Sequence, residues 1–161
     1  MKVNTKSILP GVTLAVFLSG CASTNIGPFF PPVNTQITVN EEITSPNSTR
    51  VYIQNGTVRH RRDVAVINPN CQFVLTRAQS DTSGLQIKPG TFNIDRVFRE
   101  SQRGTVNSTM MTFMEISSDT QPEVTRLVCQ RWGSPTLDNF VTIKEMKATL
   151  APLVTLNFPD E

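Results

Sequence analysis

Apolar and polar residues alternate along most of the chain from residue 48 onward, in short runs separated by turn residues. A period of two is typical of β-strands that cover a core with one face. Val51 and Ile53 form the first such run, and Asn55 with Gly56, a dipeptide that favours a two-residue hairpin turn, follows it. The pattern therefore predicts a strand that turns back on itself at residue 55.

Two further runs carry a cysteine on the side that faces the core. Cys71 shares its parity with Phe73, and Cys129 shares its parity with Leu127 in the strand predicted over residues 124–132. Side chains of one parity point to the same face of a strand. We therefore expect both cysteines to face the core, where they can meet across adjacent strands or sheets.

A strong turn sequence, KPGT, lies at residues 88–91. Its proline presets φ at one central position of a turn, and its glycine supplies a positive φ at the next. Alternating apolar residues lie on both sides of it, namely Leu85, Ile87, Phe92 and Ile94. This arrangement predicts a hairpin.

Residues 109–116 are apolar on both parities, with Met110 and Met114 on one and Met111 and Phe113 on the other. A strand that is covered on both faces has this composition. We therefore predict a central strand here. The alternative use of the methionines, as a binding surface, is less favoured than core filling.

The tail of the chain changes to a helical period. Thr142 and Glu145 have the spacing of a capping box, and apolar residues follow them at helical intervals up to Leu150. Together the runs predict a mainly β (α+β) domain with six or seven strands and one short C-terminal helix. Its architecture is a small antiparallel sandwich or a partly open barrel, and the pattern does not decide between them.

The first twenty residues follow a different pattern. Lys2 and Lys6 give a positively charged start, and residues 8–18 are mostly apolar. This stretch is shorter than the ~20 residues that a helix needs to cross a bilayer. A charged start and a short apolar segment are typical of a secretory signal peptide, the alternative being a short buried helix of a cytosolic domain.

The signal-like segment ends in Leu18, Ser19, Gly20 and Cys21, which resembles the lipobox of bacterial lipoprotein precursors. The resemblance covers residues 1–21 only. It implies that residues 1–20 are removed and that Cys21 carries diacylglyceryl and palmitate-type chains, which together anchor a protein stably. Ala22 in place of Asp resembles the pattern that enteric-type bacteria sort to the outer membrane, so the resemblance implies the periplasmic face of that membrane.

Residues 21–47 are rich in Pro, Asn and Thr, which predicts a lipid-anchored tether in front of a single β-rich domain over residues 48–161. Phe29 and Phe30 within the tether either dip into the membrane interface or are exposed linker residues. Thr35–Asn40 alternates and could form an edge strand.

Removal of the leader changes the charge and cysteine arguments. Without Lys2 and Lys6 the 15 basic residues fall to 13, equal to the 13 acidic residues, so a nucleic-acid partner is not indicated. Acylation of Cys21 leaves Cys71 and Cys129 as an even pair in an oxidising compartment, where disulfides persist. We expect these two residues to be bonded, the alternative being two buried thiols.

The most concentrated charge in the chain is Arg59, His60, Arg61 and Arg62. Arginine forks bind phosphate or carboxylate, so the cluster is a candidate contact for an anion or a partner, although a solvated hairpin end explains it more simply. His60 is the only histidine, and no nucleophile motif accompanies it. Trp132 either lines a ligand pocket or packs at the edge of the core.

We find no catalytic, metal-binding or cofactor motif, and we expect none of these functions. The sequence favours a non-enzymatic envelope lipoprotein with a structural or adaptor role, held to the membrane by lipid and in contact with another envelope protein. The first alternative is a module that binds a small ligand or glycan near Trp132, and an enzyme is the second.

Overall fold

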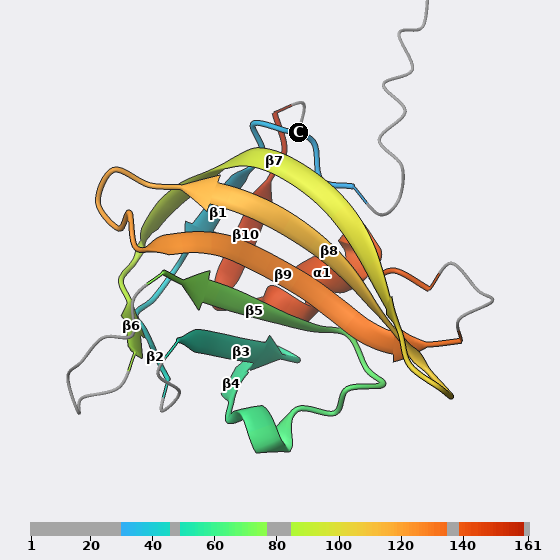
Figure 1. Cartoon of the computed structure of the whole chain (residues 1–161). Coiled ribbons are helices and arrows are strands. Elements are labelled where there is room, and N and C mark those ends of the chain that lie inside the picture. The colour runs from blue at the N-terminus through green and yellow to red at the C-terminus, as the bar shows by residue number, and fades with distance from the viewer. Residues whose placement is uncertain (1–29, 46–48, 77–84, 135–138, 160–161) are drawn as a thin grey trace, which may run out of the picture.

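The computed structural model describes residues 30–45, 49–76, 85–134 and 139–159. The described chain is mainly β, with one α-helix near the C-terminus. Cys21 and the predicted signal peptide lie outside the described residues. In the described residues, ten strands form two antiparallel sheets of eight and two strands (Figure 1).

The large sheet has the order β10-β1-β7-β8-β9-β5-β3-β4, with every neighbouring pair antiparallel. Its strands are β1 (Gln36–Val39), β3 (Arg50–Gln54), β4 (Thr57–Arg59), β5 (Asn70–Leu75), β7 (Gly90–Arg103), β8 (Ser108–Ser117), β9 (Val124–Gly133) and β10 (Val154–Asn157). The long strands β7, β8 and β9 curve strongly, so the sheet forms a half-barrel (Figure 1). Of the two predicted architectures, the partly open barrel describes it better, and the predicted number of six or seven strands was wrong.

Helix α1 (Ile143–Leu150) lies within the curve of this sheet (Figure 1). It contacts β10 at one end of the strand order and the neighbouring strands β5 and β3 near the other end, so it bridges the opening between the two ends of the half-barrel. Met146 and Leu150 on the helix are fully buried together with sheet residues such as Phe73, Phe92 and Leu127. The core therefore lies between the inner face of the sheet and the helix.

The predicted capping box is present at the start of α1. The Thr142 hydroxyl accepts a hydrogen bond from the Glu145 amide at 3.2 Å, and the Glu145 carboxylate accepts one from the Thr142 amide at 2.8 Å. The predicted turn at Asn55 and Gly56 is also confirmed, with positive φ angles of 52° and 67° between β3 and β4. These two local sequence signals therefore produce the structures that they predict.

The hairpin predicted around residues 88–91 was wrong. Strand β6 (Leu85–Ile87) pairs with β2 (Ile43–Ser45) in the small sheet, whereas β7 pairs with β1 and β8. The chain does turn at this point, but the two strands leave in different sheets. The Gln121 side chain holds the turn, with bonds to the backbone N–H and C=O of Lys88 at 2.8 and 3.0 Å.

The ordered domain also begins earlier than the predicted boundary at residue 48. Strands β1 and β2 lie within the range predicted as a tether, and β1 is not an edge strand, because it pairs with both β10 and β7. Ile37, Val39 and Ile43 are buried in the core. The alternation at Thr35–Asn40 thus corresponds to a strand, β1, whereas no pattern in the sequence indicated β2.

Candidate partner-binding face

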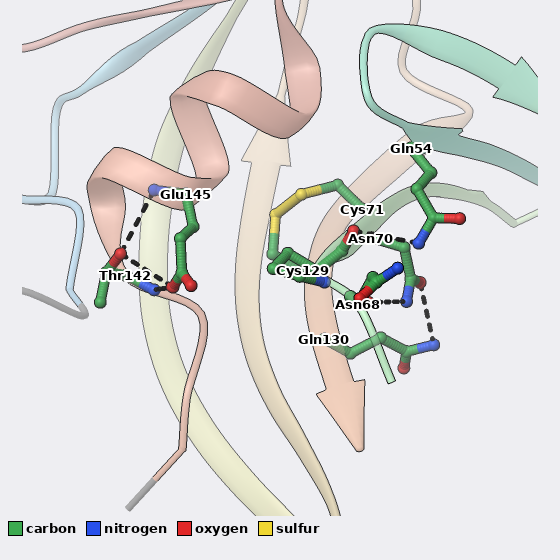
Figure 2. The surroundings of a disulfide bond; sticks show 9 residues. Gln54, Asn68, Asn70, Cys71, Cys129, Gln130, Thr142 and Glu145 are labelled. Atoms are coloured by element: carbon green, nitrogen blue, oxygen red, sulfur yellow. Dashed lines mark hydrogen bonds between the residues drawn. A yellow bond between two sulfur atoms is a disulfide. The ribbon is translucent and has the colours of Figure 1, made fainter. Parts of the chain in front are cut away.

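The predicted disulfide between Cys71 and Cys129 is confirmed. The residues lie directly opposite each other on β5 and β9, with both side chains fully buried and a bond of 2.06 Å between the sulfur atoms (Figure 2). The bond joins residues that are 58 positions apart. It therefore ties the β5 side of the half-barrel to its long central strands.

A network of amide side chains lies beside the disulfide and fastens the loop after residue 64 to the sheet (Figure 2). The Gln54 side chain bonds to the backbone N–H and C=O of Ala65, each at 3.0 Å, and also donates to the Pro69 carbonyl. Asn70 bonds to the Asn68 carbonyl and accepts a bond from Gln130. The outer faces of β3 and the start of β5 are thus covered by the chain's own loop.

The outer face of β7, β8 and β9 differs, because apolar side chains there remain partly exposed. Along β8, the residues that face α1 are buried, while those that face away are only partly buried. The outward residues of this region include Phe98, Met111, Phe113 and Trp132, which we call the outer aromatic face. The prediction that this strand is covered on both faces was therefore wrong for the outward parity.

Two rings form the centre of the outer aromatic face. Phe98 and Phe113 are register partners, with ring centroids 4.9 Å apart and planes 5° apart. The guanidinium of Arg96 lies 5.2 Å from the Phe98 ring centroid. In the same cross-strand row, Glu115 and Arg126 form a salt bridge at 3.6 Å. A charged row therefore borders the rings, as at the edge of many protein interfaces.

The other end of the outer aromatic face carries the most exposed apolar side chains. Trp132 is 44% exposed, Ile67 68% and Val106 79%. Trp132 pairs with Thr109, three residues after Val106 in the turn between β7 and β8, and its amide donates to the Val66 carbonyl at 2.7 Å. These three residues thus gather at one end of the half-barrel, and Trp132 is a surface residue.

The predicted arginine cluster lies elsewhere, on β4 and the short helix η1 (Arg61–Asp63) at the end of the strand order. His60 caps η1, because its Nδ1 accepts a bond from the Arg62 amide at 3.2 Å. Arg61 and Arg62 are exposed, while Arg59 is partly buried. The structure does not bring this cluster together with Trp132.

A group of charged and aromatic residues on the inner side of β7 and β9 was not predicted. Arg131 bonds to the carbonyls of Asn139 and Phe140 and to the Glu145 carboxylate, the last at 2.8 Å. The Arg99 guanidinium lies 4.4 Å from the Phe30 ring centroid and 4.5 Å from that of Phe140. No local motif marks these contacts, because they join segments far apart in sequence.

The environment of Glu145 changes its acidity. Burial alone would raise the pKa of this carboxyl, but hydrogen bonds from the Thr142 amide and hydroxyl, together with the charge and hydrogen bond of Arg131, outweigh it. The net effect is a pKa below the ordinary value. Glu145 is therefore held as an anion that joins the start of α1 to β9.

Comparison with known protein families, curated proteins and solved structures finds no significant match to this chain. In the described part of the chain, no group of three or more His, Cys, Asp or Glu residues is placed to hold a metal ion. The same residues include no helix that is long and apolar enough to cross a membrane.

Proposed function

We propose that this protein is a lipid-anchored adaptor of the bacterial cell envelope, which presents its outer aromatic face to another envelope protein. The proposed location follows from the resemblance of residues 18–21 to a lipobox. The disulfide is consistent with folding in an oxidising compartment, since such bonds are rare in the cytosol. The proposed role is non-enzymatic.

One observation carries the adaptor role, namely the apolar outward parity of the central strands. Phe98, Met111 and Phe113 are only partly buried among the described residues, whereas Gln54 on β3 is buried under the loop to which it bonds. Aromatic and methionine side chains are enriched at protein interfaces, and tryptophan is common among the residues that dominate binding energy. A partner that covers this face would bury the side chains that the domain leaves partly exposed.

A comparative recovery experiment tests the adaptor role. The anchored protein is cross-linked in intact cells and recovered from the envelope, as wild type and with Met111→Ser and Trp132→Ser together. We expect the double variant to recover at least tenfold less of the partner than the wild type does, while its melting temperature stays close to that of the wild type. Recovery of the same partner at the same level would contradict the role of this face.

The arginine cluster supplies the matched control. Arg61→Ser and Arg62→Ser also replace two exposed side chains, but at η1, which is not part of the outer aromatic face. We expect this variant to retain the partner. If the Arg61 and Arg62 variant loses the partner and the Met111 and Trp132 variant retains it, the partner contacts the arginine cluster and not the outer aromatic face.

The exposed indole of Trp132 supports a second candidate, which is a glycan-binding module. Sugar rings stack on exposed aromatic side chains, and Trp132 is the only tryptophan in the chain, so its fluorescence reports on this site alone. A saturable change in emission on titration with soluble peptidoglycan fragments would favour this candidate. Constant emission would leave the adaptor role as the better account.

A further inference from the structure

Three of the four exposed large apolar side chains of the described residues lie at one end of the half-barrel. We call these three, Ile67, Val106 and Trp132, the tip patch. Val106 lies in the turn between β7 and β8, three residues before Thr109, which is the register partner of Trp132. Ile67 follows Val66, whose carbonyl accepts a bond from the Trp132 amide. The tip patch is therefore assembled from three separate segments.

The tip patch projects from the sheet and carries no acid. In Figure 1 the end of the β7–β8 hairpin extends beyond the ends of β3 and β5, and residues 101–107 are all exposed. No Asp or Glu occurs in the segments that form this end, residues 64–70, 101–110 and 130–134. Of the two arginines there, Arg131 is bonded to Glu145, and Arg103 is exposed and long enough to keep its charge in water. No carboxylate would therefore be desolvated if the tip patch entered an apolar medium.

The described chain enters the domain from the same end. Phe30, the first described residue, contacts Arg99, whereas Asn34 donates its amide hydrogen to the Ile94 carbonyl. The chain thus runs antiparallel to β7, from the side of the hairpin turn towards the other end of that strand. Residue 30 is therefore nearer to the tip patch than residue 34 is.

A lipid on Cys21, which the proposed function requires, would hold the tip patch within reach of the bilayer. Cys21 is nine positions before Phe30, and nine residues span at most about 32 Å when fully extended. The turn begins at Gly104, five residues after Arg99 on β7, which is about 17 Å along a strand. The anchor can therefore stay in the membrane while the turn touches its surface.

Lipid suits the shape and size of the tip patch better than a protein partner does. A stable protein interface takes about 800 Å² from each side, whereas the tip patch is three side chains on a projecting turn, a strand end and a loop. Tryptophan is enriched at the membrane–water interface, because its ring is apolar and its N–H is polar. Phe98 lies six residues before Gly104, about 20 Å from the turn along β7. The centre of the outer aromatic face thus stays clear of the bilayer and open to the partner.

We infer that the tip patch inserts into the lipid interface of the membrane that carries the anchor. Val106 and Ile67 enter the upper part of the acyl chains, and Trp132 lies at the level of the headgroups. Burial of one exposed valine or isoleucine side chain strengthens association by about tenfold. The anchor makes these contacts effectively intramolecular, so three side chains are enough to orient the domain.

The fluorescence of Trp132 tests the inference, because Trp132 is the only tryptophan in the chain. The lipid-anchored protein is reconstituted into vesicles of phosphatidylcholine, and into matched vesicles whose acyl chains carry bromine near the headgroup. Bromine quenches an indole only at short range, so it reports contact with the bilayer. We expect emission to fall by roughly half in the brominated vesicles, as for an indole at the interface. Equal emission in the two vesicle types would overturn the inference.

Matched valine variants locate the contact. Val106→Ser removes a side chain that is 79% exposed in the turn. Val33→Ser removes one that is 51% exposed next to Asn34, which bonds to Ile94, ten residues before the turn. We expect Val106→Ser to lose at least half of the quenching by bromine and Val33→Ser to keep it, with both melting temperatures close to that of the wild type. Equal quenching in the two variants would contradict insertion through the tip patch.

Two further outcomes separate this inference from the proposed function. Lipid on Cys21 is checked first by intact mass, and its absence would overturn the anchor and the insertion together. If the lipid is present, the wild type shows no quenching by bromine and Val106→Ser loses the cross-linked envelope partner, the tip patch is part of the protein interface. That result would overturn insertion and leave the adaptor role standing.

Discussion

The Glu145 carboxylate makes both a local contact at the start of helix α1 and a long-range contact with the sheet. It completes the capping box with Thr142 and pairs with Arg131 on β9, so the start of the helix and the central sheet share a single anion. The capping box is readable from sequence, because it depends on residues three positions apart. The pairing with Arg131 is not, because it depends on the packing of α1 against the sheet.

The low pKa of Glu145 predicts a pH-dependent contribution to stability. A carboxyl whose pKa is lower in the folded state stabilises the fold above its unfolded pKa, and the effect is lost as the pH falls through the folded value. We expect Glu145→Gln to lower the free energy of unfolding at pH 7 by about 0.5–1 kcal/mol, since the side chain is partly solvated. Urea unfolding at pH 7 and pH 3 measures this, and the difference from wild type should shrink at pH 3. A constant difference would contradict the assigned role of the charge.

The disulfide stabilises the fold mainly by restricting the conformations of the unfolded chain. A cross-link between residues 58 positions apart restricts the unfolded state by about 4 kcal/mol on the loop-entropy estimate. We expect Cys71→Ser with Cys129→Ser to lower the free energy of unfolding by roughly that amount, measured by urea unfolding. Wild type unfolded in the presence of dithiothreitol is the control and should resemble the variant. An unchanged midpoint in both would show that the bond adds nothing to stability.

At the scale of elements, the β3–β4 hairpin and the end of α1 fit closely against each other. The Gly56 amide donates to the Thr149 carbonyl at 2.8 Å. A Cβ on Gly56 would lie 2.0 Å from the Ala151 carbonyl oxygen, and the φ of +67° also favours glycine. This contact helps to hold one end of the half-barrel closed on the helix.

We therefore expect Gly56→Ala to destabilise the domain by about 2–3 kcal/mol, through backbone strain and the collision with Ala151. Gly90→Ala is the matched control, because its Cβ would meet only side-chain atoms, namely Gln121 Nε2 at 3.4 Å and Thr120 Oγ1 at 4.0 Å. Thermal melting of both variants measures the difference. Equal melting temperatures would contradict the close fit of the hairpin to the helix.

The alternation of apolar and polar residues was sufficient to predict most of the individual strands. The spacing of Thr142 and Glu145 predicted the capping box, and the dipeptide Asn55–Gly56 predicted the turn. These local signals did not predict which strands pair. Strand β6 leads into a real turn, yet it pairs with β2 rather than with β7. The alternation at Thr35–Asn40 did indicate strand β1, but the expected edge position was wrong, because β1 pairs on both sides. Pairing between distant segments depends on the whole sheet, and a local pattern does not contain that information.

The candidate site was also predictable from sequence only in part. The apolar outward parity of residues 109–116 was visible in sequence, and the expected cover was another layer of this domain. The structure provides that layer only on the inner face, so the outward side chains become a candidate surface for a partner. The stack of Arg99 between Phe30 and Phe140 was not predictable, because it joins three separate segments.

At the scale of the whole molecule, a lipid on Cys21 underlies the proposed location in the cell envelope. It is tested most directly by labelling cells with a palmitate analogue and measuring the intact mass of the purified protein. We predict a chain that begins at Cys21, carries lipid there and remains in the membrane fraction. We also predict that Cys21→Ser loses both the label and the cleavage. An unlabelled wild type, or a Cys21→Ser variant with unchanged processing and membrane fraction, would contradict the account.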